Sequence, residues 1–232
     1  MKNKFINKKT ALYISVGVIL LAWLNKIIKN TSSIDTVIDM SAQQFFLSAF
    51  IGLIITLLLI TLLLRLSKER FSDIGLNREK MFGQLRTGFL FGVLVFILVL
   101  FFIEPVIGIL FPNASAEGMD MSKLFNNIYF YPVWIFISIF KGGFAEELWR
   151  TFTLTRFEKL FGKKGLVFAL IAASLVFGVG HLYQGFGGFI SNSIEGLIYA
   201  LIYLRKRSAL EAISAHAVYD LIGVTLGFII YY

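Results

Sequence analysis

The segment Ala42–Leu66 reads AQQFFLSAFIGLIITLLLITLLLRL and decides the fold class of the chain. Its only charged side chain is Arg65, next to its end. A bilayer with a hydrocarbon core of about 30 Å is crossed by about 20 mostly apolar residues in helical conformation. We therefore expect this segment to cross a membrane as an α-helix.

Apolar runs of similar length recur along the whole sequence. They cover residues 11–28, 42–66, 84–111, 127–158, 165–183, 187–204 and 208–231. The fourth run is too long for one simple span, and Pro105 in the third should kink or end a helix. The pattern predicts an all-α, polytopic membrane bundle with seven or eight spanning or re-entrant helices.

The composition of the 232 residues agrees with this fold class. Apolar residues make up 57% of the chain and charged residues 16%, and the mean hydropathy is +0.79. Soluble domains average about 45–50% apolar and about 25% charged residues. These values exclude a soluble globular enzyme, a disordered protein and a nucleic-acid-binding domain. Because the chain has no cysteine, a disulfide framework, a thiolate nucleophile and a cysteine metal site are excluded as well.

The net charge of +8 is explained by membrane topology. All but four of the 22 basic residues lie at alternate connections: before the first run and at residues 65–86, 150–164 and 205–207. Basic residues concentrate in cytoplasmic loops, so we expect a multi-pass cell-membrane protein with a cytoplasmic N-terminus. The abundance of Lys, Asn, Ile and Phe suggests a bacterial source. The four exceptions are Lys26, Lys29, Lys123 and Lys141.

Ionisable side chains at membrane depth gather in the second half of the chain. They lie in KGGFAEELWR (141–150), in FGVGH (177–181), at Glu195 and in HAVYD (216–220). Such groups are costly in a bilayer and mark functional sites. Both histidines of the chain, His181 and His216, belong to this set.

Helical spacing predicts which of these groups are neighbours. Arg150 follows Glu146 by four residues and Glu147 by three, so it can pair with either carboxylate. Adjacent residues point about 100° apart on a helix, so we expect one carboxylate in a pocket and the other held by Arg150. His216 and Asp220 share a helix face. This set suits general-base activation of water, with histidine as partner or metal ligand. A structural ion pair and an interhelical polar clamp are the alternative interpretations.

Three motifs occur in this order: Glu146-Glu147 followed by Arg150, Phe177 followed by His181, and His216 followed by Asp220. Together they resemble the CPBP family of intramembrane proteases, which includes CAAX-processing endopeptidases of the Rce1 type and Abi (bacteriocin self-immunity) proteins. The resemblance covers about residues 127–226. It implies N-terminal transmembrane helices over 1–126, with a cytoplasmic loop at 67–86, and a catalytic core over 127–232, all in one integral membrane domain. The catalytic residues that it implies are Glu146, Glu147, His181, His216 and Asp220, supported by Arg150 and Phe177.

The sequence departs from the family pattern at two places. The family usually has three residues between the second Glu and the Arg, whereas this chain has two, Leu148 and Trp149. Aligned on the carboxylates, Glu146 is the base, with Glu147 as the alternative. Asp220 stands where Asn is commoner, and a carboxylate donates to an oxyanion only when protonated. Asp220 would therefore orient His216 or bind a metal.

The resemblance implies an endopeptidase that cleaves a peptide or membrane-protein segment near the cytoplasmic leaflet. Glu146, helped by His181, would activate water, while His216 and Asp220 would shape the oxyanion site. The cofactor stays open: His181, His216 and Glu146 could bind Zn²⁺, and a metal-free glutamate mechanism needs the same residues. The partners expected are the substrate and the lipid bilayer, with no nucleic acid.

Two other functions use the same residues. A non-catalytic immunity or scaffold protein would hold a partner in the membrane through this core. A small transporter would use Glu146, Glu195 and the histidines as a proton path, although no inverted repeat supports it.

Overall fold

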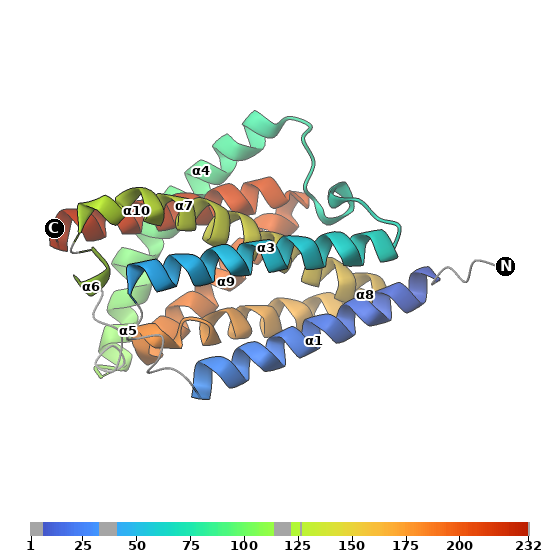
Figure 1. Ribbon diagram of the computed structural model, residues 1–232, viewed down its shortest axis with the longest axis horizontal. Coiled ribbons are helices and arrows are strands. Elements are labelled where there is room, and N and C mark those ends of the chain that lie inside the picture. Colours follow the sequence, from blue (N-terminus) through green and yellow to red (C-terminus); the bar gives the residue numbers. More distant parts are fainter. Residues whose placement is uncertain (1–6, 33–40, 114–121, 126, 232) are drawn as a thin grey trace.

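The computed structural model describes residues 7–32, 41–113, 122–125 and 127–231, and over these residues the chain is helical with no strand (Figure 1). The prediction of an all-α fold is confirmed. The α-helices are α1 (Lys8–Ser32), α3 (Ala42–Leu66), α4 (Met81–Leu98), α5 (Glu104–Leu110), α6 (Ser122–Phe125), α7 (Tyr131–Phe136), α8 (Glu147–Val179), α9 (Gly185–Lys206) and α10 (Ala209–Tyr231). Short 3₁₀ turns lie at Phe71–Ile74, Ile128–Phe130 and Leu182–Gln184, and π-helical segments at Val99–Ile103 and Ile137–Glu146.

Six helices in the described part of the chain are long and apolar enough to cross a membrane, which makes this a multi-pass membrane protein. The predicted count of seven or eight is slightly too high, because the runs 127–158 and 165–183 count together as the stretch Ile128–Val179, although this stretch turns at Gly162. Pro105 does not end a helix either. It lies just after the π-helical segment Val99–Ile103 within the continuous helix Met81–Leu110, so the hydrogen-bond pattern of the helix changes just before the proline.

The stretch Ile128–Val179 reverses direction at Gly162, where φ is +67° and ψ is −153°. A Cβ atom on Gly165 would lie 2.5 Å from the carbonyl oxygen of Phe157. The rings of Phe157 and Phe168 are 5.6 Å apart. The two limbs therefore pack side by side as a hairpin, and residues equally distant from Gly162 become neighbours.

A second hairpin joins α9 to α10 at Arg207, which has a left-handed φ of 54°. The hydroxyl of Ser208 accepts a hydrogen bond from the backbone N–H of Glu211 at 3.1 Å and so caps the start of α10. Tyr219 donates to Glu195 at 2.9 Å across the two limbs. These two residues are also equally distant from their turn.

Two glycines of α4 hold α10 at close range. A Cβ atom on Gly88 would lie 2.5 Å from the carbonyl oxygen of Glu211, and one on Gly92 would lie 2.5 Å from that of Ala215. Small residues four apart allow membrane helices to approach closely.

The predicted loop 67–86 is shorter than expected, because α4 begins at Met81.

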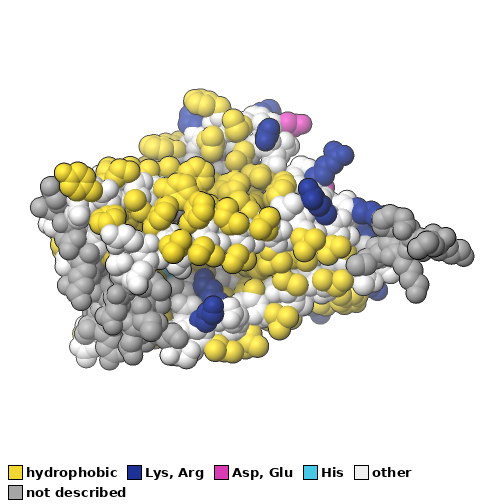
Figure 2. Space-filling model, viewed as in Figure 1, with side chains coloured by type: hydrophobic (Ala, Val, Ile, Leu, Met, Phe, Trp, Pro, Cys, Tyr) yellow, Lys and Arg dark blue, Asp and Glu magenta, His cyan; other side chains and the backbone are white. Residues whose placement is uncertain are grey.

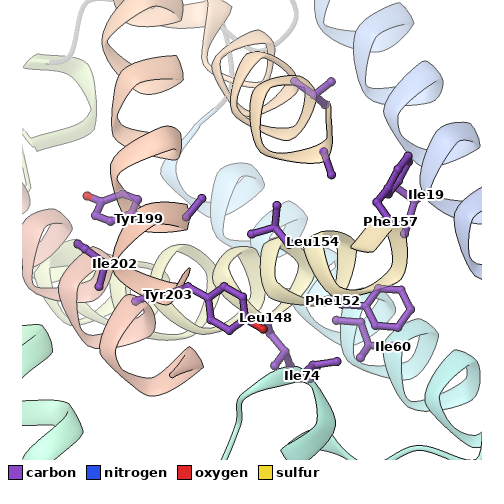
Figure 3. Close-up of a cluster of buried hydrophobic side chains, with 14 of the residues drawn as sticks. Ile19, Ile60, Ile74, Leu148, Phe152, Leu154, Phe157, Tyr199, Ile202 and Tyr203 are labelled. Atoms are coloured by element: carbon purple, nitrogen blue, oxygen red, sulfur yellow. The ribbon is translucent and has the colours of Figure 1, made fainter. Parts of the chain in front are cut away.

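Apolar side chains form both the interior and much of the outer surface. The main buried cluster includes Leu148 and Phe152 from α8 and Tyr203 from α9 (Figure 3). Hydrophobic side chains also cover much of the surface in Figure 2, and Leu58 and Phe101 are more than half exposed. An apolar surface of this extent indicates contact with lipid.

Candidate active site

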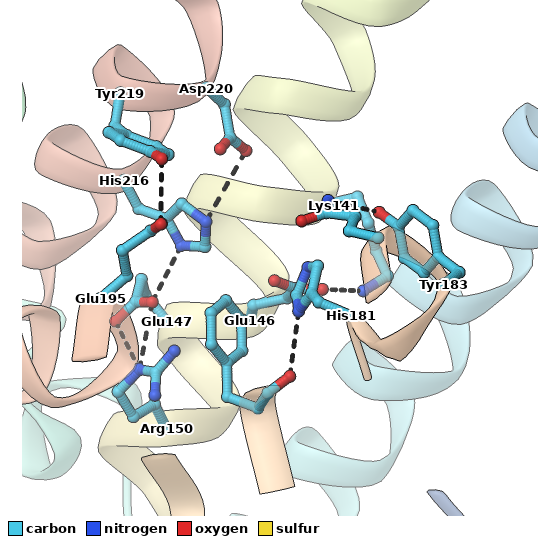
Figure 4. Close-up of polar contacts among 12 residues, drawn as sticks. Lys141, Glu146, Glu147, Arg150, His181, Tyr183, Glu195, His216, Tyr219 and Asp220 are labelled. Carbon is cyan, nitrogen blue, oxygen red and sulfur yellow. Dashed lines mark hydrogen bonds and ion pairs between the residues drawn. The ribbon is translucent and has the colours of Figure 1, made fainter. Parts of the chain in front are cut away.

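A row of buried charged groups links α8 to α10 (Figure 4). Arg150 donates through Nε to both carboxylate oxygens of Glu147, at 3.0 and 3.1 Å. Nδ1 of His216 lies 2.9 Å from Oε1 of the same carboxylate. Glu147 is completely buried, and Arg150 and His216 are less than 5% exposed. Helical spacing allowed Arg150 to pair with either Glu146 or Glu147. In the structure it pairs with Glu147, whose side chain points into the bundle.

Asp220 continues this row toward the π-helical segment Ile137–Glu146. Its Oδ2 is 3.6 Å from Nε2 of His216, beyond ordinary hydrogen-bond length. A Cβ atom on Gly142 would lie 2.2 Å from Oδ2 of Asp220, so a side chain at position 142 would force this carboxylate to move. Segments of π-helix occur frequently at functional sites.

Glu146 points away from Glu147, as neighbouring positions on a helix do. Its carboxylate binds Nζ of Lys141 at 2.5 Å, and its side chain is 20% exposed. It lines a pocket of about 390 Å³. The pocket lies between α1, α3 and the hairpin, and it is lined by Ala22, Trp23, Asn25, Lys26, Gly52, Ile55, Thr56, Leu59, Lys141, Ala145, Glu146, Trp149, Arg150, Thr153, Ala173, Val176 and Phe177.

The ring of Phe177 lies between the charged groups. The Arg150 guanidinium is 4.5 Å from its centroid, and the rings of His181 and His216 are 4.7 and 5.7 Å away. Phe177 and Glu147 lie equally far from the turn at Gly162, so the hairpin brings them together. His181 is fixed at the end of this limb by a contact of 2.9 Å between its Nδ1 and the carbonyl oxygen of Phe177.

The structure therefore brings the seven predicted site residues, Phe177 among them, into one region of the bundle, but only some of them face the pocket. Glu146, Arg150 and Phe177 line it, whereas Glu147, His181, His216 and Asp220 do not. At 1.5 Å per residue, Glu146 lies about 24 Å along the helix from Gly162. The site is thus deep in the helix bundle and remote from the turn.

The donor set proposed for Zn²⁺ does not fit a metal ion in this arrangement. Among the described residues, no three His, Asp or Glu side chains are grouped so that they could hold one. Glu146 is bound by Lys141, and Nδ1 of His216 faces Glu147. We derive no catalytic step through a metal.

Two residues of the site were not assigned from the sequence. Lys26 reaches it from α1, where its Nζ lies 5.5 Å from the centroid of Phe177, and Lys141 binds Glu146. Both belong to the four basic residues that lie outside the basic connections. Their position outside the basic connections is the sequence feature that could have identified them as site residues.

Residues 127–222 match the family model described as type II CAAX prenyl endopeptidase Rce1-like. The match confirms the resemblance to the CPBP proteases and covers the helices that carry Glu146, His181 and His216. Comparisons with curated proteins and with solved structures found no match.

Proposed function

We propose that this protein is an intramembrane endopeptidase that hydrolyses a peptide bond in a peptide or membrane-protein substrate. One observation carries the proposal. Glu146 is a carboxylate at the wall of a membrane-embedded pocket, and both histidines of the chain lie around the adjacent Phe177. The match of residues 127–222 to an endopeptidase family supports it.

In the proposed mechanism Glu146 is the general base. Its carboxylate takes a proton from a water molecule while the water oxygen attacks the carbonyl carbon of the substrate. The tetrahedral intermediate then expels the amine, which receives the proton from Glu146. His181, which interacts electrostatically with Glu146, would orient the water. Glu147 is poorly suited to this role because Arg150 and His216 already occupy its oxygens.

His216 and Asp220 would shape the site of the developing oxyanion. Because Nδ1 of His216 faces Glu147, Nε2 is the ring nitrogen available to a reacting carbonyl. The Arg150–Glu147 pair fixes the ring in this orientation, and Tyr199 stacks on it at 4.5 Å. Preorganised donors of this kind stabilise tetrahedral intermediates. The depth of Glu146 favours a substrate segment within the bilayer over one at the cytoplasmic leaflet.

A non-catalytic immunity or scaffold function is the second candidate. The ion pair between Lys141 and Glu146 favours it, because this contact occupies the carboxylate that would act as base. In that function the pocket would bind a partner without cleaving it.

Cleavage of fluorescence-quenched peptides by the full chain in detergent tests the proposal. We expect Glu146→Gln and His181→Ala to lower kcat at least about 100-fold, the scale of a lost general base. Glu79→Gln, the same change at an exposed residue, should keep full activity. Full activity of Glu146→Gln would overturn the assignment. If wild type cleaves no peptide and Glu146→Gln still binds a partner, the scaffold function is established instead.

A further inference from the structure

Lys26 is a lysine of a membrane-spanning helix whose ammonium has no ion-pair partner among the residues that the structure describes. It reaches from α1 across the end of the hairpin, where a Cβ atom on Gly180 would lie 2.1 Å from its Cε. Its Nζ faces the ring of Phe177 at 5.5 Å and lines the pocket. Over residues 7–32, 41–113, 122–125 and 127–231, no carboxylate lies within 4 Å of this Nζ.

The charges around the pocket do not balance. Arg150 is compensated by Glu147, and Lys141 by Glu146. The charges of Glu146, Lys141 and Arg150 all act on Lys26, so two of these three neighbours repel it. An uncompensated ammonium at membrane depth is costly and marks a binding function. The pocket therefore has one positive charge to offer an anionic ligand.

Uncharged donors in the pocket point to the same class of ligand. The hydroxyl of Thr153 is buried and has no hydrogen-bond partner among the described residues. It lines the pocket together with Asn25 and Thr56. An unsatisfied buried hydroxyl is unfavourable unless a ligand accepts its hydrogen bond. A carboxylate has two acceptor oxygens, one for an ammonium and one for a hydroxyl.

We propose that this pocket is a carboxylate-binding subsite, in which Lys26 pairs with a carboxylate of the substrate and Thr153 donates to it. The inference rests on the proposed function where it calls the ligand a substrate. Because Glu146 is in the same pocket, the bond to be cleaved would lie close in sequence to the carboxylate. The carboxylate belongs either to a C-terminus or to an acidic side chain, and the two sources share this chemistry.

Peptide binding tests the subsite separately from catalysis. The probes are a labelled apolar hexapeptide with a free C-terminus, its C-terminal amide, and the amide with one Glu or Gln inside. We expect wild type to bind one carboxylate form about tenfold more tightly than its uncharged counterpart, the effect of one charge-assisted hydrogen bond. Preference for the free C-terminus identifies the terminal carboxylate, and preference for Glu over Gln identifies the side chain. Equal binding of all four peptides would overturn the proposal.

Three variants assign the preference to Lys26. In Lys26→Gln the ratio of the affinities for the carboxylate peptide and its uncharged counterpart should fall to about one. Lys26→Arg should retain the preference because the positive charge is kept. The control Lys29→Gln removes an exposed lysine of the same helix and should bind as wild type does. A preference that survives in Lys26→Gln contradicts the assignment. Selective binding without cleavage would contradict the protease function alone, and cleavage without selectivity would contradict the subsite alone.

Discussion

At the residue level, Arg150 and Glu147 bury opposite charges that neither residue could keep alone. Removing one partner of a buried ion pair costs about 3–5 kcal/mol because the other charge stays unpaired. We expect Arg150→Gln to lower the melting temperature in detergent markedly, and the double variant Glu147→Gln/Arg150→Gln to lower it less. Arg78→Gln, at an exposed residue, is the control. An unchanged melting temperature for Arg150→Gln would show that the pair is dispensable.

Sequence spacing predicts the contacts of this network that lie within one helix, but it does not predict the contacts between helices that are distant in the chain. It restricts Arg150 to Glu146 or Glu147 and separates the two carboxylates by direction. The choice of Glu147 depends on His216, which α10 brings to within 2.9 Å of it. Lys26 arrives from α1 in the same way. Contacts between residues so far apart in the chain depend on the packing of whole helices, which local periodicity does not encode.

At the level of elements, the turn at Gly162 sets the register of the hairpin that carries Glu147 and Phe177. Its combination of φ and ψ is accessible essentially to glycine alone, and another residue there costs about 1–3 kcal/mol. We expect Gly162→Ala to lower both the melting temperature and peptide cleavage. Gly17→Ala, in helical backbone with open space around it, should change neither. Normal cleavage by Gly162→Ala would show that the register has another determinant.

The helices themselves follow closely from the apolar runs, whereas their continuity does not. Runs 42–66 and 208–231 agree with α3 and α10 within a residue. The predicted break between runs 127–158 and 165–183 contains the reversal at Gly162, but the helical hydrogen bonding continues almost without interruption through it. Hydropathy locates the segments that lipid can surround, but it carries no information on the backbone angles of a single glycine.

At the level of the whole molecule, Glu69 ties the first helix and the hairpin to the connection after α3. Its carboxylate binds Lys8 at 3.4 Å, Lys159 at 3.0 Å and the buried Arg156. Burial by itself raises the pKa of Glu69, but hydrogen bonds and charges from Arg156 and Lys159 lower this pKa below its ordinary value. The folded protein therefore binds a proton at Glu69 less readily than the unfolded chain does.

This lowered pKa predicts a loss of stability in acid. The stabilisation is fully present above the ordinary glutamate pKa of about 4.3 and disappears as the pH falls through the lower pKa of the folded state. We expect the melting temperature of wild type to fall more steeply below about pH 4.3 than that of Glu69→Gln, which should start lower at pH 7. Glu79→Gln should follow wild type. Parallel curves for wild type and Glu69→Gln would contradict the proposed linkage.

The same network bears on the orientation of the molecule in the membrane. Contacts between Lys8, Glu69 and Lys159, and a backbone hydrogen bond of 2.9 Å from Ala209 to Gly75, bring the basic connections to one end of the bundle. In Figure 1 the start of α1 and the turn of α8 lie at the same side. The described parts of the four basic connections therefore lie at one end of the bundle, except Arg150, which is buried in the candidate site. The positive-inside rule predicts that this end faces the cytoplasm.

Single cysteines test this orientation directly, because the chain has none of its own. Glu79 lies exposed in the connection before α4, and Asn113 lies exposed beyond the opposite end of α5. We expect Asn113→Cys to react with a membrane-impermeant maleimide in intact cells, and Glu79→Cys to react only after the membrane is opened. The reverse pattern would place the basic end outside. The turn at Gly162, from which the depth of Glu146 is measured, would then be extracellular.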